Sequence, residues 1–259
     1  MIFDSFLFFQ ELDLLEIRLN ILYPYVNAFY IVECDKTFSG QQKDFVLDPE
    51  LFHRFKKYLD KIIYCPISVS TNHSNAWDNE RDQKQYLVPS CAEDDDIVMI
   101  SDLDEIPNPL KIQNAVSLLK NGHVDAAVFV QNLYYYYLNN LVIDNKWKGT
   151  RIAKRSYYND ARHTPYDMRF SSQHEIPNGG WHFSYLFGKD PDLILNKIKS
   201  FSHQEYNNDH HLPFVMNRIR EGQDLFGRDS VVKFQRVEVN ESFPEYIQKN
   251  LDKLTDFVI

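Results

Sequence analysis

Three carboxylates stand close together after a run of apolar residues in the stretch DDDIVMISDLDEIPNP, residues 94–109. Asp102 and Asp104 flank Leu103, and Glu105 follows at once. Because side chains alternate along an extended chain, we expect Asp102 and Asp104 to point the same way and Leu103 to enter the core. Two converging carboxylates repel each other unless they share a proton or hold a hard divalent cation. Such a cation would also attract phosphate oxygens.

Two other interpretations of this cluster stay open at the level of the residues. A solvated acidic turn that caps the following helix would have the same composition, and Asp-x-Asp tripeptides are common. The second alternative is the Asp-x-Asp of haloacid-dehalogenase phosphatases, in which the first aspartate is a nucleophile. That motif normally lies near the N-terminus and continues with Thr or Val, whereas here it follows residue 100 and continues with Glu105.

The stretch NGGWHFSYLFG, residues 178–188, indicates a second polar site. Gly179 and Gly180 permit close backbone approach or a positive φ angle. Trp181 offers a flat face for a sugar, and the imidazole of His182 offers a ligand for a metal ion. The plainer interpretation of His182 is a core or rim histidine without a ligand.

Two further segments carry charges suited to binding a diphosphate and to proton transfer. In a helix predicted over residues 77–91, Arg81 would reach a diphosphate, whereas Glu80 and Lys84 have the spacing of an exposed i,i+4 ion pair. The segment SFSHQEYNNDHH, residues 200–211, is rich in histidine, but its spacing matches no zinc site. We expect a polar loop, from which one carboxylate could act as a general base.

Strand and helix signals alternate over the first half of the chain. Leucines recur at steps of three and four between residues 12 and 22, as on one face of a helix that ends near Pro24. Strands are predicted at 1–9, 26–34, 60–67, 96–101 and 125–138, and helices at 11–25, 77–91 and 109–120. This alternation predicts an α/β fold, with a mostly parallel sheet and helices on both faces.

The second half is less regular, with helices predicted at 190–200, 212–222 and 244–254. No repeat or linker divides the chain, so we expect one domain over residues 1–259. Within it, about 1–130 would form a nucleotide-binding half and about 131–259 an acceptor-binding half. Glu33 and the cluster from Asp102 to Glu105 both end predicted strands, which places them on the edge of the sheet where ligands of α/β proteins bind.

Composition excludes several classes of function. The formal net charge of −9 argues against nucleic acid as a partner, because phosphate backbones need a positive face. No run approaches the roughly 18 apolar residues of a membrane span, and the N-terminus lacks the basic start of a signal peptide. The 3 cysteines form no CxxC pair, which favours a reducing compartment. We therefore expect a cytoplasmic protein. Aromatic residues make up 15% of the chain and would fill the core or line a sugar-binding cleft.

Several long segments together resemble glycosyltransferase family 17. This family includes the vertebrate β-1,4-mannosyl-glycoprotein 4-β-N-acetylglucosaminyltransferase and smaller microbial and viral relatives. The resemblance runs in the family's order from residue 4 to about residue 228. It rests on the segments DSFLFFQELDLLEIRLNILYPYVNAFYIVEC, SDLDEIPNP, GGWHFSYLF, KIKSFSHQEY and IREGQDLFGR.

The resemblance implies a GT-A fold, in which a Rossmann-like sheet and an Asp-x-Asp motif hold Mn²⁺ or Mg²⁺ and a nucleotide sugar. It also implies transfer with inversion, with UDP-GlcNAc as the donor and a glycan as the acceptor. By this analogy Asp102 would contact the ribose or the metal, and Asp104 would ligate the metal. His182 would be a later metal or phosphate ligand. Glu33 would lie where such enzymes hold the uridine, and Arg81 under the donor.

The resemblance also implies a carboxylate that deprotonates the acceptor hydroxyl. Glu205 is the first candidate for this base, Asp224 the second and Glu175 the third. Trp181 and Glu105 are expected on the acceptor side of the site. The vertebrate enzyme has a membrane anchor and a longer catalytic region than this sequence, so its N-glycan acceptor does not carry over. A metal-dependent phosphohydrolase and a carbohydrate-binding protein without catalysis are the alternative functions.

Overall fold

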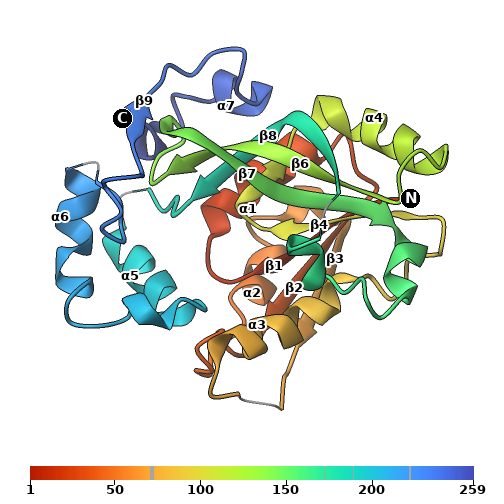
Figure 1. Cartoon of the computed structure of the whole chain (residues 1–259), viewed down its shortest axis with the longest axis horizontal. Helices are drawn as coiled ribbons and strands as arrows, with labels where there is room; N and C mark the ends of the chain where they lie inside the picture. The colour runs from red at the N-terminus through yellow and green to blue at the C-terminus, as the bar shows by residue number, and fades with distance from the viewer. Residues whose placement is uncertain (71–72, 172, 189, 222) are drawn as a thin grey trace.

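One mixed sheet forms the centre of the computed structural model, which describes residues 1–70, 73–171, 173–188, 190–221 and 223–259 (Figure 1). The strands are β1 Ile2–Phe8, β2 Ala28–Cys34, β3 Ile62–Ile67, β4 Ile97–Asp102, β5 Glu105–Pro107, β6 Ala126–Tyr135, β7 Asn140–Lys154, β8 His174–Ser184 and β9 Phe234–Arg236. The helices are α1 Leu12–Leu22, α2 Leu47–Leu51, α3 Ala76–Lys84, α4 Pro109–Lys120, α5 Pro191–Ser200, α6 Val215–Arg220 and α7 Glu245–Lys249.

The strand order is β3-β2-β1-β4-β7-β6-β8-β5, with β9 beside β7. Strands β3, β2, β1 and β4 are parallel, which confirms the predicted Rossmann-like arrangement. The chain builds β2 and β3 on one side of β1 and then places β4 on the other side. In open α/β sheets a ligand crevice forms where the order reverses in this way, beyond the carboxyl ends of the strands.

Helices cover both faces of this sheet, as predicted. On one face, alternate residues such as Phe6, Ile31 and Met99 pack against α1, α4 and α7 in the main core. On the other face, Val32 and Val98 pack with Leu87, which follows α3. The leucines predicted for the inner face of α1 are buried or partly buried against this core.

The second half is more regular than its sequence indicates, because β6, β7, β8 and β9 continue the same sheet. Gly179 and Gly180 explain why the strand signal of β8 is weak. A Cβ atom on Gly180 would lie 2.1 Å from the carbonyl oxygen of Ile106, and one on Gly179 would lie 2.6 Å from the amide nitrogen of Val130. The two glycines therefore allow close packing of β8, and this prediction is confirmed. The division of the single sheet into two functional halves stays a prediction.

Two helices of the second half pack away from the rest of the sheet, around a smaller hydrophobic cluster. Ile194 and Ile198 of α5 and Val215 of α6 share this cluster with Tyr135, the last residue of β6, and with Tyr185, which follows β8. In Figure 1, α5 and α6 lie together on one side of the molecule, and α3 lies near the base. Three predicted helices end earlier than expected, since α3 stops at Lys84, α6 at Arg220 and α7 at Lys249.

Candidate active site

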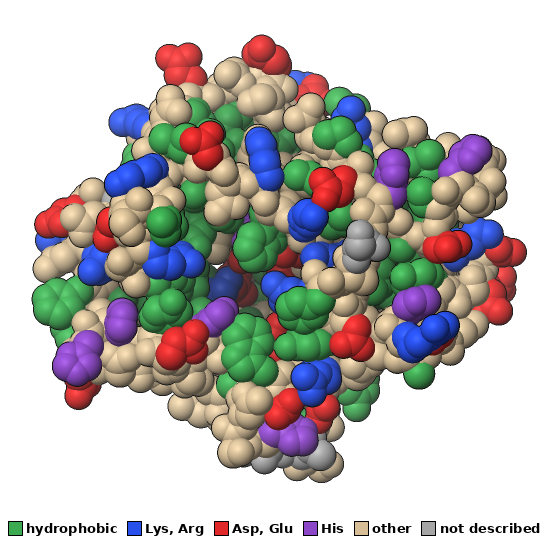
Figure 2. All heavy atoms as spheres, in the orientation of Figure 1, with side chains coloured by type: hydrophobic (Ala, Val, Ile, Leu, Met, Phe, Trp, Pro, Cys, Tyr) green, Lys and Arg blue, Asp and Glu red, His purple; other side chains and the backbone are tan. Residues whose placement is uncertain are grey.

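A cavity of about 320 Å³ opens at the carboxyl ends of β1, β2 and β4. The strand register places Leu7 of β1 beside both Val32 of β2 and Asp102 of β4, so the three strands end at one edge. Helices α3 and α5 and the segment after α5 complete the walls, through residues such as Trp77, Lys197 and His203. Figure 2 shows this face hollowed near its centre, with basic and hydrophobic side chains around the opening.

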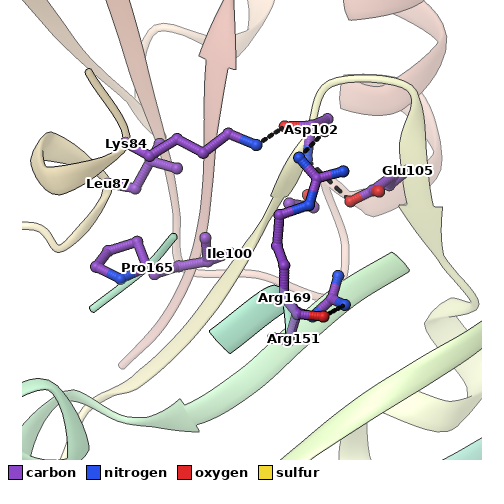
Figure 3. A pocket seen from close by; sticks show the side chains of 9 residues that line it. Lys84, Leu87, Ile100, Asp102, Glu105, Arg151, Pro165 and Arg169 are labelled. Atoms are coloured by element: carbon purple, nitrogen blue, oxygen red, sulfur yellow. Dashed lines mark hydrogen bonds and ion pairs between the residues drawn. The ribbon is translucent and has the colours of Figure 1, made fainter. Parts of the chain in front are cut away.

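Both aspartates of the Asp-x-Asp segment line this cavity, and Leu103 between them is buried in the main core at the edge of the cavity. Asp102 Oδ1 lies 2.9 Å from Lys84 Nζ, and its Oδ2 lies 3.4 Å from Arg169 Nη1. Figure 3 shows the lysine and the arginine approaching Asp102 from different elements. Each oxygen of this carboxylate therefore has a cationic partner.

The second aspartate has partners from the other half of the chain. Asp104 Oδ1 lies 3.3 Å from His182 Nε2 on β8, and its Oδ2 lies 3.2 Å from Lys197 Nζ on α5. Burial raises the pKa of the Asp104 carboxyl, but the charge of Lys197 and the interactions with His182 outweigh burial and hold this pKa well below its usual range. Asp102 behaves in the same way beside Lys84 and Arg169. Both carboxylates are therefore ionised, and a shared proton is not what holds them together.

The predicted Glu80–Lys84 pair exists, but it is buried. Lys84 Nζ lies 2.8 Å from Glu80 Oε1, and both side chains are less than a tenth exposed. Glu80 Oε1 also lies 3.1 Å from Arg169 Nη1, and its Oε2 accepts a hydrogen bond from Ser202 Oγ at 2.5 Å. The surface interpretation of this pair was wrong, because this face of α3 turns toward Asp102. The network links α3, β4 and the segment after α5.

A fully buried arginine holds the backbone of the Asp-x-Asp segment. Arg18 of α1 is paired with Asp4 of β1, through Nε–Oδ2 and Nη2–Oδ1 distances of 2.9 and 2.6 Å. Its Nη2 also donates to Ser101 Oγ at 2.6 Å. Its Nη1 lies 2.9–3.0 Å from three backbone carbonyl oxygens, those of Asp102, Leu103 and Glu105. One guanidinium thus fixes the turn that aims both aspartates into the cavity.

We expect Arg18→Met to lower the free energy of unfolding by about 3–5 kcal/mol, because it leaves the Asp4 carboxylate buried without a partner. Urea denaturation measures this change. The double variant Asp4→Leu/Arg18→Met removes both charges and should recover most of the loss. A single variant within 1 kcal/mol (about a fivefold change in the folding equilibrium) of the wild type would contradict the account.

Two residues predicted to hold the nucleotide do not line the cavity. Glu33 is completely buried, and its oxygens accept hydrogen bonds from Tyr64 Oη, Lys43 Nζ and the backbone at the start of α2. Arg81 lies on the exposed side of α3, where it pairs with Asp78 and lies over the ring of Tyr166. The structure therefore assigns Glu33 to internal support and Arg81 to the surface.

The two residues predicted for the acceptor side also lie elsewhere. The Trp181 ring is part of the main core, and its Nε1 donates to the carbonyl oxygen of Ser242 at 3.1 Å. Glu105 is buried, and its Oε2 accepts from the Asp102 amide at 3.0 Å. Its Oε1 accepts from Trp147 Nε1 at 2.6 Å. Trp147, by contrast, lines the cavity and lies 4.8 Å from the His182 ring, between centroids.

None of the three carboxylates predicted as the base lines the cavity. Asp224 is completely buried and accepts hydrogen bonds from Arg228 and from two backbone amides of its own loop. Glu175 is exposed on β8, where it pairs with Lys148. Glu205 is half exposed beside the cavity, and its Oε1 lies 2.6 Å from His203 Nδ1.

The donors at the Asp-x-Asp segment fit a hard divalent cation bound together with a phosphorylated ligand. Within the described residues no group of three His, Cys, Asp or Glu side chains is gathered for a metal. The oxygen–nitrogen pair of Asp104 and His182 does face the cavity, and His182 Nδ1 is buried without a hydrogen-bond partner. Mg²⁺ sites of nucleotide enzymes use one or two carboxylates and take their remaining ligands from substrate phosphates and water. Two protein ligands are sufficient for such a site.

The sequence profile of glycosyltransferase family 17 matches residues 1–231. The chain belongs to this family. It is a glycosyltransferase, and the match favours this function over the two alternatives, a phosphohydrolase and a sugar-binding protein without catalysis. No curated protein matches the chain.

Solved structures similar to this glycosyltransferase are remote in sequence. S. aureus TarS is 13% identical over 86% of this chain and 44% of that chain, with a TM-score of 0.43. Residues 1–349 of S. aureus TarS, solved with UDP, are 12% identical over 85% of this chain and 72% of that one, with a TM-score of 0.42. A 4-diphosphocytidyl-2C-methyl-D-erythritol synthase is 10% identical over 68% and 86% of the two chains, with a TM-score of 0.41. In the described part of the transferase, no helix has both the length and the hydrophobicity to span a bilayer.

Three basic residues that sequence reasoning missed lie at this site. Arg169, Lys197 and Arg228 all line the cavity. Lys197 begins the segment KIKSFSHQEY and Arg228 ends the segment IREGQDLFGR, so both stand in stretches that carry the family resemblance. Their position in these two segments was the signal from which they could have been predicted as site residues. Arg169 stands in no such stretch, and nothing in its sequence context indicates its role.

Proposed function

We propose that this glycosyltransferase moves a sugar from a UDP-sugar, with UDP-GlcNAc as the donor, onto a glycan hydroxyl with inversion. One observation carries the proposal: the Asp-x-Asp pair lies at the switch point of a Rossmann-like sheet, in a cavity that also contains His182 and Lys197. Carboxylates beside cations in such a crevice are suited to a diphosphate that is bound with a divalent metal.

The nucleoside of the donor would occupy the end of the cavity above β1 and β2. Phe8, Phe9, Cys34 and Thr37 line this end and offer apolar and polar contacts for a base and a ribose. This placement replaces Glu33, which has no free oxygen for a uridine. Asp102, at the end of β4, lies at the same edge and is proposed to face the ribose or the metal.

Asp104 and His182 would hold Mn²⁺ or Mg²⁺. When bound, the cation would supply positive charge next to the diphosphate. The remaining chemistry belongs to the chain itself. Lys197 Nζ lies 3.2 Å from Asp104 Oδ2 and would donate hydrogen bonds to the diphosphate as it leaves. Arg228 is aligned by buried Asp224 and by Tyr135 Oη, at Nη2–O distances of 2.7 and 3.2 Å, and would add a second positive charge.

The sugar and the acceptor would lie on the aromatic side of the cavity. Trp77, Trp147 and Tyr206 line it and give flat apolar faces beside polar groups. Together they replace Trp181 in the role predicted from the sequence. The net charge of −9 is consistent with a neutral glycan rather than a nucleic acid as the acceptor.

A thermal-shift screen of nucleotides and nucleotide sugars, with and without Mn²⁺, tests the proposal. UDP and UDP-GlcNAc should raise the melting temperature only when Mn²⁺ or Mg²⁺ is present, because the diphosphate and the metal bind together. ADP- and GDP-sugars should give smaller shifts. A response to guanine or adenine nucleotides alone would contradict the choice of UDP, and equal shifts after EDTA would contradict the metal.

A further inference from the structure

Transfer with inversion needs a group that accepts the proton of the acceptor hydroxyl. The carboxylates that line the cavity are all paired with cations. Asp102 and Glu80 lie 2.9 and 2.8 Å from Lys84 Nζ, and Asp104 and Glu11 lie 3.2 and 3.0 Å from Lys197 Nζ. Each lies in an ion pair with its lysine partner, which leaves none of them as a free base.

A histidine beside the cavity, unlike these carboxylates, is not paired with a cation among the residues that the structure describes. His203 lines the cavity, and its Nδ1 lies 2.6 Å from Glu205 Oε1. Within the described part of the chain, its Nε2 makes no hydrogen bond, and the side chain is 48% exposed. A carboxylate bound at Nδ1 selects the tautomer whose proton is on Nδ1, so that Nε2 keeps a lone pair.

The imidazole is held in place by rings from two elements. The Trp77 ring of α3 meets it edge-on at 4.6 Å between centroids, and the Phe201 ring lies 5.5 Å away. The preceding residue, Ser202, donates to Glu80, which is part of the network around Asp102. The segment that carries His203 is therefore anchored on the network of side chains that holds Asp102.

We propose that His203 is the general base of the transfer, with Glu205 as the residue that positions it. This inference rests on the proposed function. The acceptor oxygen gives its proton to His203 Nε2 and forms a bond to the anomeric carbon of the donor. The bond from that carbon to the diphosphate oxygen breaks, and its electron pair leaves with UDP. The imidazolium then releases its proton to solvent, because the side chain is half exposed.

The assignment also gives a role to Glu205, the first candidate for the base from the sequence. Burial raises the pKa of Glu205, but its hydrogen bond and electrostatic interaction with His203, together with a backbone hydrogen bond, outweigh burial and lower this pKa. A carboxylate that holds its charge more firmly is a weaker proton acceptor and a better partner for an imidazolium.

The test uses the full chain with UDP-GlcNAc, Mn²⁺ and water as the acceptor, and follows UDP release. We expect His203→Gln to bind UDP within about threefold of the wild-type affinity but to turn over roughly 100-fold or more slowly. Glu205→Gln should lose about 10-fold, in kcat rather than in KM. Added imidazole should restore part of the activity of His203→Ala. His210→Gln, an exposed histidine of the same loop, is the matched control and should keep its activity.

The outcomes separate this inference from the function on which it rests. A wild-type chain that neither binds UDP nor releases it from UDP-GlcNAc would overturn both. An active wild type with His203→Gln above a third of its turnover would overturn the base assignment alone. Loss of UDP binding in His203→Gln would overturn it as well, because the histidine would then be a donor ligand.

Discussion

Asp104→Asn is expected to weaken Mn²⁺-dependent UDP binding by at least about 100-fold, and to remove turnover with it. Asparagine keeps the shape of the side chain but has no charge for a cation. The neutral amide also removes the partner that Asp104 offers to His182 and Lys197, at 3.3 and 3.2 Å. Isothermal titration of UDP in the presence and absence of Mn²⁺ measures the change.

Glu175→Gln is the matched control for this substitution. Glu175 stands on β8, the strand of His182, but is exposed and lies outside the cavity lining. The Glu175→Gln variant should therefore bind UDP with the wild-type affinity. Unchanged Mn²⁺-dependent UDP binding in Asp104→Asn would contradict the assignment of the metal to the Asp-x-Asp segment.

The second large effect is expected at Lys197. Lys197→Gln should lower the rate of UDP release roughly 100-fold or more, because one preorganised charged donor at the departing diphosphate is lost. The side chain approaches two carboxylates, Glu11 and Asp104, which hold its Nζ in the cavity. Their charges raise the pKa of Lys197 against the effect of burial, so the ammonium group is charged. Steady-state kinetics of UDP release from UDP-GlcNAc measure the loss.

Lys199→Gln is the control on the same helix, since Lys199 is exposed and does not line the cavity. It should leave the rate unchanged. If Lys197→Gln raised KM and kept kcat, Lys197 would bind the donor in its ground state without helping the diphosphate to leave.

The fold was largely predictable where its signals are local. The leucines of α1 and the segment of α4, which begins with the cap Asn108 and Pro109, locate their helices closely. Strands β7 and β8 were missed for different reasons. The middle of β7 is polar and exposed, and β8 contains Pro177 and two glycines that a lone strand would not favour. Both strands are formed by pairing with β6, which is a long-range effect.

The site was predictable as far as strand ends determine it. Asp102, Asp104 and His182 meet at one cavity. The predicted strand before the two aspartates indicated their place, whereas His182 was expected beside them only from its own segment and the family resemblance. Which face of α3 turns inward was not predictable from the sequence. Lys84 was expected at the surface and Arg81 at the donor site, and the structure reverses these two positions. Lys84 holds Asp102, whereas Arg81 stays at the surface. Burial of a charged i,i+4 pair depends on what the fold brings opposite it.

The predicted bases show a limit of reasoning from residue types. Asp224 carries a carboxylate in a segment that resembles the family, but its oxygens hold Arg228 and the turn of its own loop. Glu205 stands next to the cavity but is turned toward His203. A carboxylate in the right segment can act through another side chain, and only the three-dimensional arrangement distinguishes the two cases.

The most direct test of the account is UDP release from UDP-GlcNAc by the purified chain, followed during titration with Mn²⁺ and then EDTA. We predict turnover that appears with Mn²⁺ or Mg²⁺, stops with EDTA and is absent from Asp104→Asn. Turnover at the same rate without a divalent cation, or in Asp104→Asn, would contradict the assignment of the Asp-x-Asp cavity as a metal-dependent nucleotide-sugar site.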